Sequence, residues 1–155
     1  MLLTCRIKVN APAETVFACV DEPEHIVRWV GGAVDHVYVN ERNPANPVGQ
    51  KFLQKLKMGN SVREFEGKII AWEKPTHFGL FIPSPAYSSE AHFRIRPEGS
   101  SSSTVDYSID VTLHTLAARV IGAVLRIPLG FFVQNQIGKL KSYAESLQAS
   151  RKGAG

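Results

Sequence analysis

The most extended apolar pattern in the chain lies near its C-terminus, between Leu116 and Leu147. Apolar side chains recur there in steps of three and four residues, which places each run on one face of a helix. The first run is Leu116, Val120, Val124, Ile127 and Phe131, and the second is Ile137, Leu140, Ala144 and Leu147. A helix of this length would span about 48 Å. Pro128 removes one backbone donor, so we expect a kink or break near Leu125.

The preceding part of the chain changes to a period of two, which is typical of β-strands with one buried face. The pattern predicts a first strand over residues 3–9, followed by two short helices that begin near Pro12 and Pro23. It then predicts six strands, over residues 34–40, 51–57, 62–72, 77–82, 87–96 and 105–113. Loops rich in proline, glycine and asparagine separate these strands.

A sheet followed by one terminal helix is an α+β arrangement, in which the helix buries its apolar stripe on the concave side of the sheet. The length of 155 residues fits one domain. We assign residues 1–148 to this domain and expect residues 149–155 to form a flexible basic tail.

Charge is distributed unevenly along the chain. Residues 116–155 carry six basic residues against Glu145 alone, a net charge of +5, whereas the first 115 residues carry −1. We favour a core-facing stripe with a solvated basic back, with a membrane or nucleic-acid surface as the alternative. Arg119 and Arg126 argue against a transmembrane span, since an arginine near the bilayer centre costs about 2.5–3.5 kcal/mol. Nothing in the basic residues indicates nucleic-acid binding.

The N-terminus and the cysteines indicate the compartment. The segment from Met1 to Arg6 becomes charged too early for a signal peptide. Cys5 and Cys19 lack metal-ligand spacing, and free thiols are the expected state in a reducing compartment. We therefore expect a cytoplasmic protein.

The common catalytic and metal-binding motifs are absent from the sequence. The five histidines lack ligand spacing, and there is no HEXXH, CxxC, GxSxG or phosphate-binding glycine loop, so we expect neither a metal nor a cofactor. Polar pairs that alternate along strands, such as His36 with Tyr38, are more typical of a solvated surface than of catalysis.

Three residues are the candidates for chemistry. Tyr107 is a phenol on an apolar strand face, where a buried hydroxyl needs a partner. Arg63 would reach the same face in one strand phase, but its neighbours support both phases. His114 starts the long helix at the end of the sheet where the Pro83-Ser84-Pro85 loop and the Gly59-Asn60 turn gather, which we expect to be the mouth of a pocket.

The inward strand positions and the helix stripe together predict a pocket wall. Its members are Phe52, Phe65, Ile69, Phe93, Tyr107, Ile109 and Val111 from the strands and Val120, Val124, Ile127 and Phe131 from the helix. Taken alone, each of these side chains is more typical of a residue that fills the core than of one that binds a ligand. A curved sheet gripped by one helix, however, encloses more space than side chains usually fill, and such apolar concavities are typical small-molecule sites.

The order of elements and several local patterns resemble the START/Bet v1-like (SRPBCC) superfamily, and within it the polyketide cyclase/dehydrase and lipid-transport branch. The resemblance rests on residues 7–17, 21–24, 47–49, 70–75 and 140–145 and on Trp29. It covers nearly the whole chain and implies a helix-grip, a seven-stranded antiparallel sheet wrapped around a long C-terminal helix with a cavity between them. It implies no particular reaction, because the superfamily includes carriers, receptors, cyclases and chaperone cofactors.

Three functions are compatible with these observations. We favour binding or transport of a small hydrophobic molecule (a lipid, a polyketide or an aromatic compound) in an internal cavity, by a monomer or homodimer. The second is a cyclase or dehydratase, with Tyr107, His114 or Arg63 acting on a poly-carbonyl chain. The third is a module that docks on an anionic membrane or a partner protein through the basic, apolar C-terminal helix.

Overall fold

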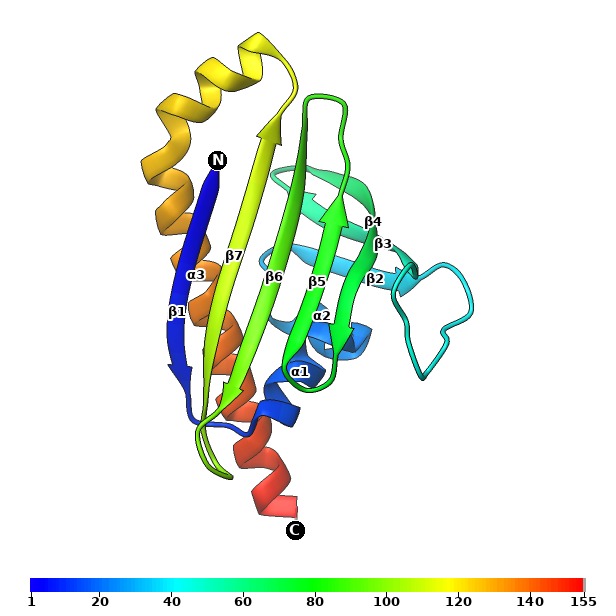
Figure 1. The fold of residues 1–155 in the computed structure, drawn as a ribbon, viewed down its shortest axis with the longest axis vertical. Coiled ribbons are helices and arrows are strands. Elements are labelled where there is room, and N and C mark those ends of the chain that lie inside the picture. Colours follow the sequence, from blue (N-terminus) through cyan, green and yellow to red (C-terminus); the bar gives the residue numbers. More distant parts are fainter. Residues whose placement is uncertain (155) are drawn as a thin grey trace.

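The computed structural model describes residues 1–154 and shows a curved sheet that grips one long helix (Figure 1). The strands are β1 (Leu2–Val9), β2 (Ala33–Tyr38), β3 (Lys51–Met58), β4 (Ser61–Glu73), β5 (His77–Ile82), β6 (Tyr87–Pro97) and β7 (Ser103–Leu113). The helices are α1 (Ala13–Asp21), α2 (Pro23–Trp29) and α3 (Leu116–Ala154). The predicted α+β helix-grip, with two short helices after the first strand, is confirmed.

All seven strands form one antiparallel sheet in the order β1-β7-β6-β5-β4-β3-β2. From β2 to β7 the sheet is a meander, because each strand pairs with the next one in sequence. β1 completes it by pairing with β7, so that Cys5 lies opposite Tyr107. This register places the alternating apolar residues of both strands on the concave face.

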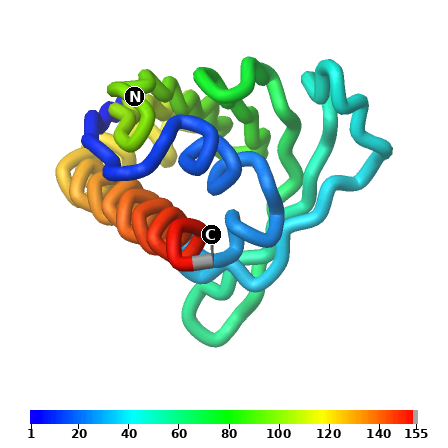
Figure 2. Tube along the Cα trace, turned by 90° about the horizontal axis from the view of Figure 1, so that it is seen from below, coloured from blue at the N-terminus to red at the C-terminus, as the bar shows by residue number. Residues whose placement is uncertain are grey.

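The helices α1 and α2 close one end of the sheet against the C-terminal half of α3 (Figure 2). Phe17 of α1 is fully buried and meets the rings of Trp72 and Phe78 edge-on, at centroid distances of 5.7 and 6.0 Å. The indole N–H of Trp29 donates a hydrogen bond to the carbonyl of Cys19 at 2.8 Å, which joins α2 to α1. The densest part of the core therefore lies at this end.

Of the kink or break predicted near Leu125, the break is wrong, because the long helix α3 is continuous over 39 residues. It curves along its course instead (Figure 1). Pro128 removes only one donor, and it lies on an exposed part of the helix, where a freed carbonyl costs little because solvent can reach it. The helix continues through residues 149–154, the segment expected to be a tail, and Gly155 lies outside the described residues.

Only the second apolar run of α3 faces the core. Ile137, Leu140 and Ala144 are at most 1% exposed. The first run, by contrast, lies on the outer side of the helix. Its members Val120, Val124, Ile127 and Phe131 are between 60% and 74% exposed, so their predicted place on the concave side is wrong.

Candidate ligand-binding site

A cavity of about 420 Å³ lies between the concave face of the sheet and the middle of α3. Most of its wall is apolar, with contributions from α1, α2, α3 and all seven strands. Among the predicted strand residues, Phe52, Phe65, Phe93, Tyr107, Ile109 and Val111 line this cavity. Ile69 does not line it, because that side chain is fully buried in the core next to α1 and the strands.

The helix side of the wall comes from residues other than the predicted ones. Val120, Val124, Ile127 and Phe131 point away from the cavity, because the first apolar run occupies the opposite side of α3. The wall is instead formed by Leu129, Phe132, Val133, Gln136 and Ile137. They lie where the first run ends and the second begins, on the turns of α3 that face the sheet.

The cavity meets the surface at one end of the sheet. Among its lining residues, Met58 at the end of β3, Tyr87 at the start of β6 and Phe132 of α3 are exposed. His114 lies at this same end, where its backbone N–H donates to the carbonyl of Ala86 at 2.9 Å. The ring of His114 contacts the hydroxyl of Ser88 outside the cavity, so His114 is not part of the cavity wall.

Arg63 also lies outside the cavity. It pairs directly with Leu56, a lining residue, so it shares the inward strand phase that the sequence left ambiguous. It stands near the start of β4, beyond the wall, and its side chain is exposed. Of the three candidates for chemistry, the structure therefore brings only Tyr107 into the cavity.

Tyr107 presents a protonated phenol to the cavity. Its ring lies 4.8 Å from the ring of Phe93, centroid to centroid. Burial, with a smaller contribution from the neighbouring Cys5, raises the pKa of Tyr107 above its ordinary value. The hydroxyl therefore keeps its proton at neutral pH and can donate a hydrogen bond.

His36 is the residue that the sequence analysis placed on the surface and the structure places in the wall. It is only 7% exposed, and its ring stacks on Phe52 at a centroid distance of 4.9 Å. Its Nδ1 atom is buried and has no hydrogen-bond partner among residues 1–154. Burial lowers the pKa of His36 to about 4, although Asp35 opposes this change. The imidazole is therefore neutral at pH 7.

The stacked arrangement depends on a glycine in the adjacent strand. Gly67 lies opposite Phe52, and a Cβ atom on Gly67 would come within 2.4 Å of the Phe52 ring. The absent side chain lets Phe52 lie flat against β4, and His36 stacks on the ring.

Two glutamines add amide groups to the wall. Gln54 lies opposite His36 in the register of β2 and β3. The inward orientation of Gln54 could have been predicted from the sequence, because residues 52, 54 and 56 alternate along β3 and so point to the same face. Gln136 of α3 accepts a hydrogen bond from the backbone N–H of Gly31 at 3.0 Å and so joins the helix to the turn after α2.

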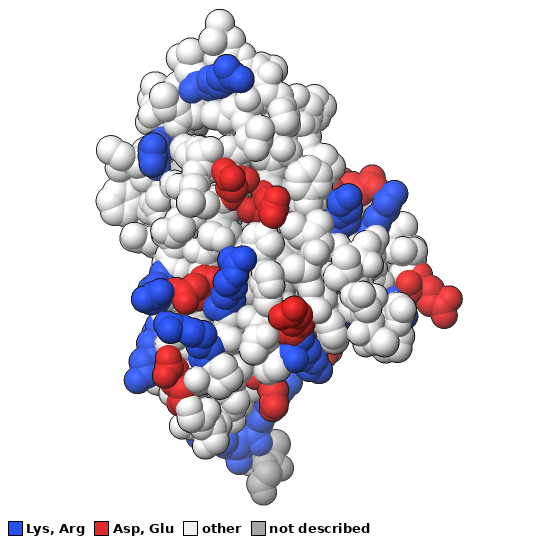
Figure 3. All heavy atoms as spheres, viewed as in Figure 1, with Lys and Arg blue, Asp and Glu red and all other residues white. Residues whose placement is uncertain are grey.

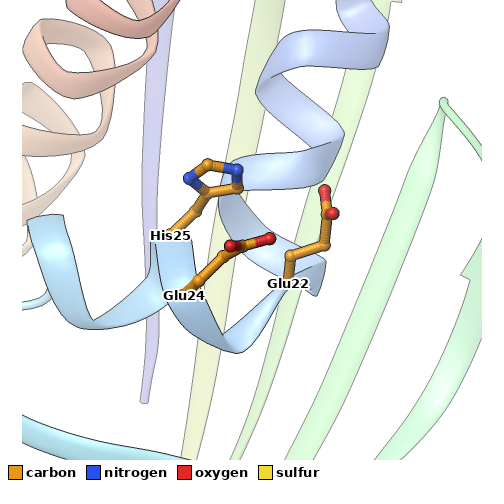
Figure 4. Close-up of side chains that lie close together, drawn as sticks. All are labelled: Glu22, Glu24 and His25. Atoms are coloured by element: carbon orange, nitrogen blue, oxygen red, sulfur yellow. The ribbon is translucent and has the colours of Figure 1, made fainter.

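A separate group of metal-ligand atoms lies on the outside, at the start of α2 (Figure 4). One atom each from Glu22, Glu24 and His25 lies within 4.8 Å of the others. His25 Nδ1 is already 2.7 Å from the Tyr143 hydroxyl. Carboxylates at a helix N-terminus are favoured by the helix dipole, which explains these residues without a cation.

The fold and the cavity define a helix-grip protein of the START/SRPBCC class, in which a sheet and a C-terminal helix enclose an apolar space. The chain belongs to the family described as "Polyketide cyclase / dehydrase and lipid transport", whose model matches residues 3–145. The resemblance noted in the sequence is thereby confirmed. A comparison with curated proteins finds no match.

Solved structures share the fold at low sequence identity. A START superfamily protein from Mycobacterium smegmatis is 17% identical with a TM-score of 0.77, over 94% of this chain and 98% of that one. The Zhui aromatase/cyclase from Streptomyces sp. R1128 is 10% identical with a TM-score of 0.69, over 94% and 93%. The di-domain ARO/CYC protein BexL, from the BE-7585A pathway, is 14% identical with a TM-score of 0.76. The match covers 94% of this chain but only 46% of BexL, so the chain spans about half the length of that protein.

Proposed function

We propose that this protein binds or carries a small, largely hydrophobic molecule in the cavity between the sheet and α3. The observation that carries the proposal is an apolar wall around about 420 Å³, within the range of roughly 300–1,000 Å³ that is typical of small-molecule pockets. Membership of a family described by polyketide cyclisation and lipid transport supports it.

The few polar groups of the wall indicate what the ligand carries besides its apolar body. Tyr107 is a neutral donor, and His36 has a buried nitrogen without a partner among the described residues. A buried polar atom without a partner costs about 1–3 kcal/mol, so a ligand atom that pairs with it is favoured. Because both side chains are neutral, the ligand group that suits them is an uncharged carbonyl or hydroxyl.

Filling the cavity tests this proposal. Ala91 is a buried lining residue on β6, and Ala91→Trp would place an indole in the cavity. Glu90→Trp is the matched control, because Glu90 is the exposed neighbour on the same strand. We expect wild type and Glu90→Trp to bind fluorescent fatty-acid or aromatic probes at micromolar levels and Ala91→Trp to bind at least tenfold more weakly. If every probe fails to bind wild type, or if Ala91→Trp binds as well as wild type, the proposal is wrong.

Tyr107→Phe tests the polar part of the recognition. The substitution removes one hydroxyl and leaves the ring in place. A lost hydrogen bond is worth about 0.5–1.5 kcal/mol, so a probe with a carbonyl group should bind roughly twofold to tenfold more weakly. A purely hydrocarbon probe should bind unchanged. Equal effects on both probes would show that the hydroxyl does not contact the ligand's polar group.

A second candidate function is cyclisation or dehydration of a poly-carbonyl chain. The family description and the structural similarity to aromatase/cyclases support it, together with a phenol donor in the wall. The pKa values weigh against it, because proton transfer at neutral pH is most efficient from groups with a pKa near 7, whereas that of His36 is lowered and that of Tyr107 is raised. Turnover of a linear poly-carbonyl analogue that Tyr107→Phe abolishes without loss of binding would favour this candidate.

A further inference from the structure

The first half of α3 presents a continuous apolar surface to solvent. The large side chains on it are more than half exposed: Leu116, Val120, Val124, Ile127, Phe131 and Phe132. Single exposed apolar residues are ordinary, but a contiguous patch marks an interaction site. We call the segment Leu116–Phe132 the apolar arm.

The apolar residues of the apolar arm are not explained by burial in a protein core. By length and composition α3 could cross a membrane, yet only 11% of its most apolar window is buried. The inner side of the arm is fixed to the domain, because Gly122 packs against Leu113 at the end of β7. Its outer side has nothing over it within the described chain. The apolar arm therefore differs from an ordinary amphipathic surface helix, because its most apolar face is turned toward solvent and not toward the core.

The charges of the arm indicate what covers this face. No acidic residue occurs between Asp110 and Glu145, whereas Arg119 and Arg126 are both exposed on the arm. They are seven residues apart, so they follow one line beside the edge of the apolar stripe. In the face shown in Figure 3, the surface where α3 begins carries basic but no acidic side chains. A second copy packed arm against arm would offer these arginines no counter-charge, because residues 111–144 contain no Asp or Glu, whereas anionic lipid headgroups would.

We propose that the apolar arm docks in the headgroup region of an anionic lipid bilayer, with its outer face inserted and its arginines at the lipid phosphates. An apolar stripe with flanking basic residues is the composition that suits this interface. Phe132 belongs both to the arm and to the exposed rim of the cavity. Docking therefore brings the cavity opening to the bilayer surface. The proposal does not depend on any ligand in the cavity, and its test uses none.

Vesicle co-sedimentation of the full chain tests the docking. Val124→Glu with Ile127→Glu disrupts the outer face at two exposed positions. Val39→Glu with Val62→Glu is the matched control, because it makes the same charge change at exposed valines outside α3. On vesicles of phosphatidylcholine with phosphatidylserine, we expect wild type and the control to bind and the arm variant to bind at least tenfold more weakly.

The arginines are tested separately. Arg119→Gln with Arg126→Gln should weaken binding to the phosphatidylserine vesicles by roughly fivefold per arginine and leave any binding to pure phosphatidylcholine unchanged. Absence of vesicle binding by wild type, or equal binding by the arm variant, overturns the proposal. Sedimentation velocity that shows a dimer, dissociated by the arm variant, also overturns it and identifies a second copy as the occupant.

Discussion

The buried imidazole of His36 couples the stability of this protein to pH. The pKa of His36 is about 4 in the folded chain, against 6.5 as the ordinary value. The unfolded chain therefore binds more protons than the folded chain between these two pH values. The contribution of His36 is fully present above pH 6.5 and is lost as pH falls toward 4. A difference of one pKa unit corresponds to about 1.4 kcal/mol, so the unfolding free energy falls by about 3 kcal/mol over this range.

Urea denaturation of wild type and His36→Phe, from pH 7 down to about pH 4, measures this contribution. The replacement ring can stack on Phe52 but does not titrate. Carboxylates and other histidines act equally in both proteins, so we expect the difference in unfolding free energy to move by about 3 kcal/mol in favour of His36→Phe as pH falls.

His77→Gln is the control for His36→Phe. Burial, and then the nearby Arg94 and His92, also lower the pKa of His77, but it is less buried. We expect His77→Gln to change the pH dependence less than His36→Phe does. A wild-type-to-His36→Phe difference that stays constant with pH would refute a neutral, buried imidazole at this position.

Two further substitutions test the packing around the site. Gly67→Ala should destabilise the protein by about 1–3 kcal/mol, because its Cβ would overlap the Phe52 ring, whereas Gly138→Ala, with open space around it, should be neutral or stabilise α3 by up to about 1 kcal/mol. Thermal unfolding separates these results, and equal effects would contradict the close packing at Gly67. Asp21→Asn should cost about 1.5–3 kcal/mol, because the carboxylate of Asp21 is buried and bonds Arg42 at 2.5 Å. A loss below about 0.5 kcal/mol would show that this pair contributes little.

The strands and the inward wall of the sheet were predictable because their signal is local. Apolar residues with a period of two, separated by glycine and proline turns, fix both the strand and its buried face. Phe93, Tyr107 and Ile109 could thus be assigned to the concave side before their neighbours in the sheet were known.

The orientation of α3 could not be predicted in the same way. Phe131 and Ile137 are six residues apart, so at about 100° per residue the second apolar run begins about 120° around the helix from the end of the first. The sequence contains this change of face, but both runs are equally apolar, and only tertiary contacts decide which of them is buried. Leu140, at 0% exposure, belongs to the run that packs in the core.

His36 was missed for a related reason. The edge strand β2 carries valines on both faces, so its pattern does not distinguish inside from outside. In the folded sheet Val37 is on the exposed face, and His36 is on the inward face, where its ring stacks on Phe52 of β3. Curvature of this kind depends on the whole sheet, and no local spacing encodes it.

We propose above that the interior of this protein holds a small hydrophobic molecule. Native mass spectrometry of freshly purified wild type and of Ala91→Trp, followed by organic extraction, tests it most directly. We expect a discrete apolar compound, bound to wild type or taken up from added probes, and absent from the variant with the filled cavity. A wild-type protein that keeps its apo mass and takes up no probe would contradict it.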